Sequence, residues 1–187
     1  MAGDMSEMAE RFRKVARGFT DRAEAVPDGA WDNPTPCEGW VARDIVRHLV
    51  DWMPGFFLRS AGLEFTTGPS ADDDPAGAWR PLRDALQAAL DDPEIAARQY
   101  DSPAGPMTVE HAIDQFGTND ILVHIWDLAR ATGLDETLDA DEVRRAVDAM
   151  APHDAAMRRS GHYGPRVDVP DDADEQTRLL AFCGHRP

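Results

Sequence analysis

The chain has 187 residues and a formal net charge of -16, with 35 acidic against 19 basic side chains. This length favours one domain, residues 1–187, and the negative charge argues against nucleic acids and anionic membranes as partners. No apolar run approaches the roughly 20 residues of a membrane span, and no secretory signal opens the chain. Cys37 and Cys183 lie too far apart to indicate a disulfide framework. We therefore expect a cytoplasmic protein.

Two amphipathic helices and a structured loop are predicted in the first third of the chain. Apolar residues recur at spacings of three, four and seven from Met5 onward, which predicts a helix from Ser6 to Ala25. A second helix is expected from Val41 to Phe57, where Pro54 would kink or end it. Between the two, the segment from Trp31 to Trp40 has two prolines and a glycine among its tryptophans, so we expect a packed, irregular loop.

A third helical pattern follows a stretch rich in Gly, Ser and Asp. It contains Trp79, Leu82, Leu86 and Leu90, at spacings of three and four. Asp74 followed by Pro75 is one plausible start for this helix, and a later start with Pro81 in the first turn is the other.

Two further helices and an irregular end are expected in the second half of the chain. After a loop from Asp101 to Pro106, a fourth helix would be capped by Thr108 and end at Thr132, with Gly133 after it. A fifth helix would start at Asp139, with Glu142 three positions later, and run through Val143, Val147 and Met150.

Beyond Ser160 only a short helix from Thr177 to Phe182 is indicated, and Pro165 to Pro170 would be an extended strap across the bundle. Long amphipathic helices with irregular connections predict an all-α fold. We therefore expect a four-helix bundle with extra short helices and an irregular C-terminal segment from about residue 160 to 187.

Three polar residues occupy positions where the helical pattern calls for apolar ones. His48 lies three residues after Ile45 on the inner side of the second helix. Asp120 and His124 follow Phe116 at steps of four, so their side chains share one face of the fourth helix. Burying a carboxylate with two imidazoles is costly unless a cation pairs with them. These residues therefore form a candidate site for a divalent metal, with two His and one carboxylate suiting Zn²⁺, Fe²⁺ or Ni²⁺.

Simpler interpretations of these residues stay open. An inward histidine is more often a core residue bonded to a backbone carbonyl, and an acidic residue four positions before a histidine is common on surfaces. Asp127 could orient an imidazole from outside the ligand set or pair with Arg130. The pair Asp44 and His48 has the same spacing as Asp120 and His124, but Asp44 is better explained as part of the helix start.

The remaining candidates for chemistry are weaker. Cys37 could be a nucleophile, although a packed small residue is the simpler interpretation. Glu110 and His111 would lie in the first turn of the fourth helix, where an acidic residue favours the helix dipole. Three other histidines, in polar or irregular segments, are expected at the surface: His153, His162 and His185. No nucleotide-binding or acyl-hydrolase motif is present in the sequence.

Two stretches resemble a known family. Residues Thr35 to Trp52, TPCEGWVARDIVRHLVDW, are similar to the TPC-x-GW-x-V-x-D-(two residues)-x-H signature of actinobacterial mycothiol-dependent maleylpyruvate isomerase-like proteins. Residues Asn119 to Gly133, NDILVHIWDLARATG, are similar to the E-x-x-x-H-x-WDLA-x-ATG element of that family. The ending DEQTRLLAFCGHRP resembles the family's usual close, with His185 where an arginine is expected. The resemblance spans nearly the whole chain.

This family belongs to the wider DinB/YfiT-like group of candidate metalloenzymes, so the resemblance implies a DinB-like four-helix bundle. It also implies a metal site made of His48, Asp120 and His124. The family usually has Glu at the position of Asp120, which is one methylene shorter. Isomerase-type relatives carry an additional C-terminal domain that helps to bind substrate, and this chain is too short to contain it.

Several functions are compatible with such a site. The leading hypothesis is an enzyme in which a divalent metal, with Zn²⁺ favoured, lowers the pKa of a low-molecular-weight thiol. The resemblance implies that this thiol is mycothiol and that it reacts with a small electrophilic substrate in a transfer or isomerisation. A metal-dependent hydrolase, a non-catalytic metal or small-ligand binding protein, and a purely structural domain are the alternatives. An apolar strip on the first or fifth helix could also form a homodimer.

Overall fold

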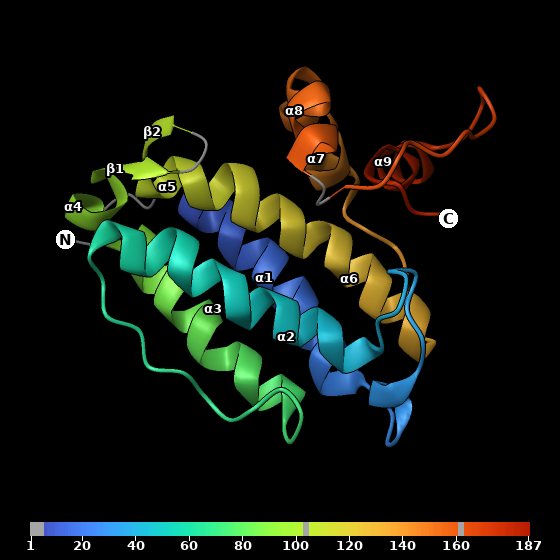
Figure 1. Ribbon diagram of the computed structural model, residues 1–187, viewed down its shortest axis with the longest axis horizontal. Helices are drawn as coiled ribbons and strands as arrows, with labels where there is room; N and C mark the ends of the chain where they lie inside the picture. Colours follow the sequence, from blue (N-terminus) through green and yellow to red (C-terminus); the bar gives the residue numbers. More distant parts are fainter. Residues whose placement is uncertain (1–5, 103–104, 161–162) are drawn as a thin grey trace.

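Four long helical segments surround the core in the computed structural model, which describes residues 6–102, 105–160 and 163–187. The helices α1 and α2 each pack against both α3 and α6, so the four close into a bundle (Figure 1). This arrangement confirms the predicted all-α class. The four segments are α1 (Glu7–Ala25), α2 (Ala42–Met53), α3 (Pro75–Asp91), and a continuous segment made of α5 (Val109–Ala112), η4 (Ile113–Thr118) and α6 (Asn119–Thr132).

The other elements are short and lie at the ends and on one side of the bundle (Figure 1). Three of them, α7, α8 and α9, follow the bundle in the sequence and stand beside it at the upper right of the view. Within the described residues the short elements are η1 (Ala30–Asp32), η2 (Pro54–Leu58), η3 (Arg59–Ala61), α4 (Pro93–Ala96), β1 (Gln99–Ser102), β2 (Gly105–Thr108), α7 (Ala140–Met150), η5 (Ala151–His153), α8 (Asp154–Ser160) and α9 (Glu175–Cys183).

Side-chain caps fix where the helices begin, as the sequence predicts. The Ser6 hydroxyl accepts a hydrogen bond from the Ala9 amide at 3.1 Å at the start of α1. The Asp139 carboxylate accepts from the Glu142 amide at the start of α7. The Asp74 carboxylate accepts from the Gly77 amide at 2.8 Å. Such caps satisfy amide groups that have no partner inside the helix. Because Asp74 caps α3, the earlier of its two proposed starts is correct, and Pro81 lies within the helix.

Two π-helical segments interrupt the long helices beside each other. Pro54 does not end the second helix: η2 continues from α2 in π-helical form. On the fourth helix, η4 separates α5 from α6, and the Thr118 hydroxyl and the Asn119 amide donate to main-chain carbonyls within this segment. A Cβ added to Gly117 would lie 3.1 Å from the Phe57 ring, so η2 and η4 approach closely at this glycine.

One prediction for an irregular segment is wrong. The stretch from Asp101 to Pro106, expected to be a loop, belongs to an antiparallel hairpin in which Asp101 pairs with Pro106, although residues 103 and 104 lie outside the described part. The segment from Pro165 to Pro170, predicted as an extended strap, forms neither helix nor strand. The Val167 amide instead donates to the Ala181 carbonyl at 3.0 Å, which holds the segment against α9.

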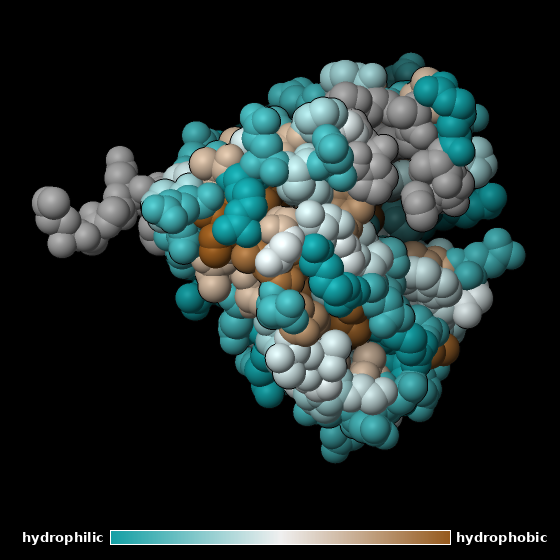
Figure 2. Space-filling view, turned by 60° about the vertical axis from the view of Figure 1, so that its left-hand side comes forward, coloured by the Kyte–Doolittle hydropathy of each residue, from teal (hydrophilic) through white to brown (hydrophobic). Residues whose placement is uncertain are grey.

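The surface reflects the acidic, polar composition. Figure 2 shows one face on which hydrophobic residues form small patches between hydrophilic ones. Within the described residues, none of the helices combines the length and apolarity that a membrane crossing requires. Cys37 and Cys183 are both free thiols, as expected from their separation in the sequence.

Candidate metal centre

The three residues singled out in the sequence lie together where α2 faces α6. The Nε2 atom of His48 is 3.2 Å from Oδ2 of Asp120, and the Nε2 atom of His124 is 3.6 Å from Oδ1. One ligand atom from each of the three residues falls within 4.8 Å of the others, so they could hold one metal ion. The four-residue spacing of Asp120 and His124 puts these two side chains on one face of the helix. The packing of α2 against α6 supplies His48.

The solvent exposure of the three side chains decreases from His48 to Asp120 to His124. The His48 side chain is 29% exposed, that of Asp120 is 18% exposed and that of His124 is 9% exposed. The His48 side of the site is therefore the more exposed one, while His124 is enclosed by protein. This asymmetry suits a centre that keeps one side open for a ligand.

The electrostatics of the pair Asp120 and His124 favour charge on both. Burial works to raise the pKa of Asp120, but the charge of His124 and the hydrogen bond from His48 outweigh it, and the pKa lies below its ordinary value of 3.8. Burial works to lower the pKa of His124, but Asp120 and Asp127 outweigh it and raise the pKa above 6.5. Asp120 is therefore ionised and can bind a cation, whereas a metal ion would have to compete with a proton for His124.

Trp52 is a contact of the site that the sequence analysis missed. Its indole Nε1 donates a hydrogen bond to Oδ2 of Asp120 at 3.2 Å. Trp52 lies one helical turn after His48 on α2. Because an indole N–H is seldom buried without an acceptor, its place beside a predicted polar site was the available signal.

Asp127 contacts the ring nitrogen of His124 that faces away from Asp120. Its Oδ2 atom lies 2.9 Å from Nδ1 of His124, and the carboxylate is fully buried. Arg130 pairs instead with Glu136 at 2.8 Å, so the alternative pairing of Asp127 with Arg130 is not formed. A carboxylate on Nδ1 fixes the imidazole so that Nε2 presents its lone pair, which is the usual support of a metal-ligating histidine.

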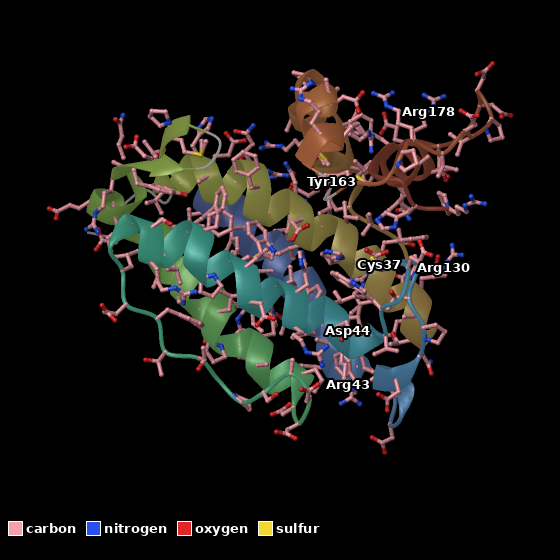
Figure 3. All side chains as sticks on the ribbon, in the orientation of Figure 1. Cys37, Arg43, Asp44, Arg130, Tyr163 and Arg178 are labelled. Carbon is pink, nitrogen blue, oxygen red and sulfur yellow. The ribbon has the colours of Figure 1, made fainter. Side chains whose placement is uncertain are left out.

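Cys37 lies behind the same carboxylate. The loop after η1 brings its Sγ atom to 3.7 Å from Oδ2 of Asp127, beside the second half of α6 (Figure 3). Cys37, His124 and Asp127 form a second group with the reach to hold a metal. Burial and the charge of Asp127 raise the pKa of Cys37 well above its ordinary value. The thiol therefore stays protonated and donates to Asp127, which disfavours the nucleophilic interpretation.

The other polar candidates have separate places. Asp44 accepts from the Val41 amide at 2.8 Å and pairs with Arg47, so it belongs to the start of α2. His111 lies in α5, in the first turn of the fourth helix as predicted, and is exposed. The prediction that His185 lies at the surface is wrong, because its side chain is 13% exposed and contacts Asp127. The predictions for His162 and for the side chain of His153 lie outside the described residues.

Fold and site together define a helical bundle with a candidate metal centre between two of its helices. The family described as the mycothiol maleylpyruvate isomerase N-terminal domain matches residues 12–129, and the chain belongs to this family. This range includes His48, Asp120, His124 and Asp127.

Among curated proteins, the chain is similar to two uncharacterized proteins of Mycobacterium tuberculosis, one from strain CDC 1551 / Oshkosh and one from strain ATCC 25618 / H37Rv. Each is 26% identical to this chain over 153 residues, which cover 81% of this chain and 82% of the relative. No solved structure matches the chain significantly.

Proposed function

We propose that this protein is a metal-dependent enzyme that uses a low-molecular-weight thiol to transfer or isomerise a small electrophile. His48, Asp120 and His124 would hold a divalent ion, with Zn²⁺ as the first candidate and Ni²⁺ or Fe²⁺ as alternatives. The observation that carries the proposal is the convergence of two imidazole nitrogens on one carboxylate, with the second nitrogen of His124 already bonded to Asp127.

The donor set fits a divalent ion. Two nitrogens and a carboxylate oxygen form a ligand set that Zn²⁺ commonly uses in catalytic sites, with a further position left for a substrate. Both Nε2 atoms point at Asp120, so a cation between them would replace proton sharing with coordination. When bound, such an ion lowers the pKa of a thiol or water that coordinates it.

The cysteines of the chain indicate that the thiol is supplied from outside. Burial keeps the Cys37 thiol protonated and raises the pKa of Cys183 to about 12. Neither side chain is therefore a ready nucleophile near neutral pH. The name of the matched family supports mycothiol as the co-substrate, since it describes a mycothiol-dependent isomerase domain.

Aromatic side chains beside the ligands would receive an apolar part of the substrate. Trp40 lies 5.2 Å from His48, ring centre to ring centre, and Trp52 lies 6.0 Å from His48. The series continues from Trp52 to Phe56 at 5.6 Å and to Phe116 at a further 5.7 Å, and all four aromatic residues are partly exposed. This surface supports a small substrate with an apolar or conjugated portion.

Metal analysis of the purified protein tests the site first. The wild type should retain about one equivalent of a divalent metal after extensive dialysis, whereas His124→Ala should retain none. His111→Ala is the matched control, because it removes an exposed histidine of the same long helix without touching the site. Full retention of metal by His124→Ala would reject the assignment.

Activity then separates the candidate functions. The loaded wild type is incubated with mycothiol and a conjugated carbonyl compound, with thiol omitted in a parallel sample, and separately with hydrolysable esters and amides. Loss of the electrophile only when both metal and thiol are present supports the proposal. Ester or amide hydrolysis without thiol would replace it with a hydrolase, and neither reaction with full metal content would favour a binding protein.

A further inference from the structure

The buried carboxylate of Asp127 has one oxygen without a hydrogen bond. Its Oδ2 atom is shared by His124 at 2.9 Å and the Cys37 thiol at 3.7 Å. Its Oδ1 atom has no hydrogen-bond partner among the described residues, although the side chain is fully buried. An unsatisfied buried carboxylate oxygen is costly, which is why such atoms are almost always paired.

A candidate donor to that oxygen comes from His185, near the C-terminal end of the described residues. Nδ1 of His185 lies 3.4 Å from Oδ1 of Asp127, slightly longer than a well-formed hydrogen bond. Burial lowers the pKa of His185, so its ring is neutral near pH 7 and carries one proton, which either ring nitrogen could hold. A proton on Nδ1 would complete the set of donors around Asp127.

The backbone holds His185 in this position. After α9 ends, Gly184 adopts a left-handed conformation with φ of 95°, and the His185 amide donates to the Leu180 carbonyl at 2.9 Å. The imidazole then packs near the Trp126 ring, with ring centres 5.7 Å apart. These contacts place the ring against α6 at the turn that carries Asp127.

We propose that His185 is a positioning residue for the metal centre: it donates from Nδ1 to Oδ1 of Asp127 and thereby fixes the carboxylate that orients His124. This inference rests on the proposed metal site and extends its support to the last residues of the chain. With Oδ1 unsupported, the carboxylate of Asp127 could rotate away from Nδ1 of His124. Loss of a group bonded directly to a metal-ligating imidazole typically lowers metal affinity by roughly 10- to 100-fold, and His185 acts on that group from one step away, so we expect an effect at the lower end of this range.

Zinc affinity of matched variants tests the proposal. His185→Leu keeps a similar volume without a donor, and His185→Asn places an amide donor close to the original Nδ1. Arg186→Ala is the control, because Arg186 is the exposed neighbour of His185. Competition with a chromophoric chelator should show about tenfold weaker zinc binding for His185→Leu, near wild-type binding for His185→Asn, and no change for Arg186→Ala. Unchanged affinity in His185→Leu, or an Asn variant as weak as the Leu variant, would overturn the proposal.

A second measurement uses the unmodified, metal-free protein and separates this inference from the proposed function. Nitrogen-15 spectra of the histidine rings report which nitrogen of His185 carries the proton. The proposal requires the proton on Nδ1, and a proton on Nε2 alone overturns it even when zinc binds well. If the wild type binds no metal, the proposed function fails. In that case the Nδ1–H signal of His124 tests the positioning role of His185. Loss of this signal in His185→Leu, together with its retention in His185→Asn, supports the role. An identical signal in the wild type and all variants refutes it.

Discussion

Replacing Arg11 with methionine should destabilise the fold far more than replacing another arginine of the same helix. The Arg11 guanidinium is buried in α1 and donates to Oε2 of Glu142 at 2.6 Å and to Oδ1 of Asp114 at 2.8 Å. It also donates to Oδ1 of Asn119 at 2.7 Å. One side chain thus ties α1 to α7, to the π-helical segment η4 and to the first turn of α6.

The cost follows from the charge left behind. Glu142 is only 4% exposed, so losing Arg11 leaves a buried carboxylate with the weaker contact from Lys14 at 3.5 Å. Removing one partner of a buried ion pair costs roughly 3 to 5 kcal/mol, and the contact from Lys14 places the expected loss at about 3 kcal/mol. Arg13 pairs with Asp91 near the surface, so Arg13→Met should cost about 0 to 1 kcal/mol.

Urea unfolding followed by circular dichroism measures both losses. The double variant Arg11→Met with Glu142→Leu should recover most of the loss, because both buried charges are then removed. If Arg11→Met costs no more than Arg13→Met, the buried ion pair does not hold these helices together and the reasoning is refuted.

Three further predictions concern the site and the end of α6. Asp120→Asn should lower the pKa of His124, because the buried imidazole loses the attraction of the carboxylate; an NMR titration of the metal-free protein that shows an unchanged midpoint would contradict this. The pKa of Asp120 is below 3.8 in the folded chain, so ionised Asp120 stabilises the fold above pH 3.8, and this stabilisation is lost as the pH falls through the folded pKa. The difference in unfolding free energy between the wild type and Asp120→Asn should therefore shrink toward low pH, as measured by urea unfolding. Gly133→Ala should cost about 1 kcal/mol, since Gly133 ends α6 with φ of 71° in the left-handed region, and an unaltered melting temperature would speak against this origin.

Helix positions could be predicted because their signals are local. Ser6 and Asp139 cap helices whose apolar spacing repeats over several turns, and both helices start where those caps require. The π-helical segments could not be predicted in this way. The close approach of Gly117 to Phe57 involves residues 60 positions apart in the sequence, and no local pattern marks it.

The site was predictable only in part for the same reason. Spacing puts Asp120 and His124 on one face and turns His48 inward on another helix, but only the resemblance to known sequences indicated that the two helices bring these residues together. The place of His185 depends on how the chain returns to α6 after α9, so its polar, irregular surroundings suggested exposure. Cys37 was difficult for a similar reason, since its contact with Asp127 joins a loop to a helix 90 residues away.

The carboxylate of Asp120 lies where α2 packs against α6. The resemblance noted in the sequence implies Glu at this position, and Asp reaches one methylene less far. Because Gly117 has no side chain, the segment that follows α2 can approach the segment that precedes α6. Both oxygens of Asp120 then reach an imidazole, and the Trp52 indole donates to one of them. We infer that the close packing at Gly117 allows this chain to place an aspartate where a longer acid would otherwise be needed.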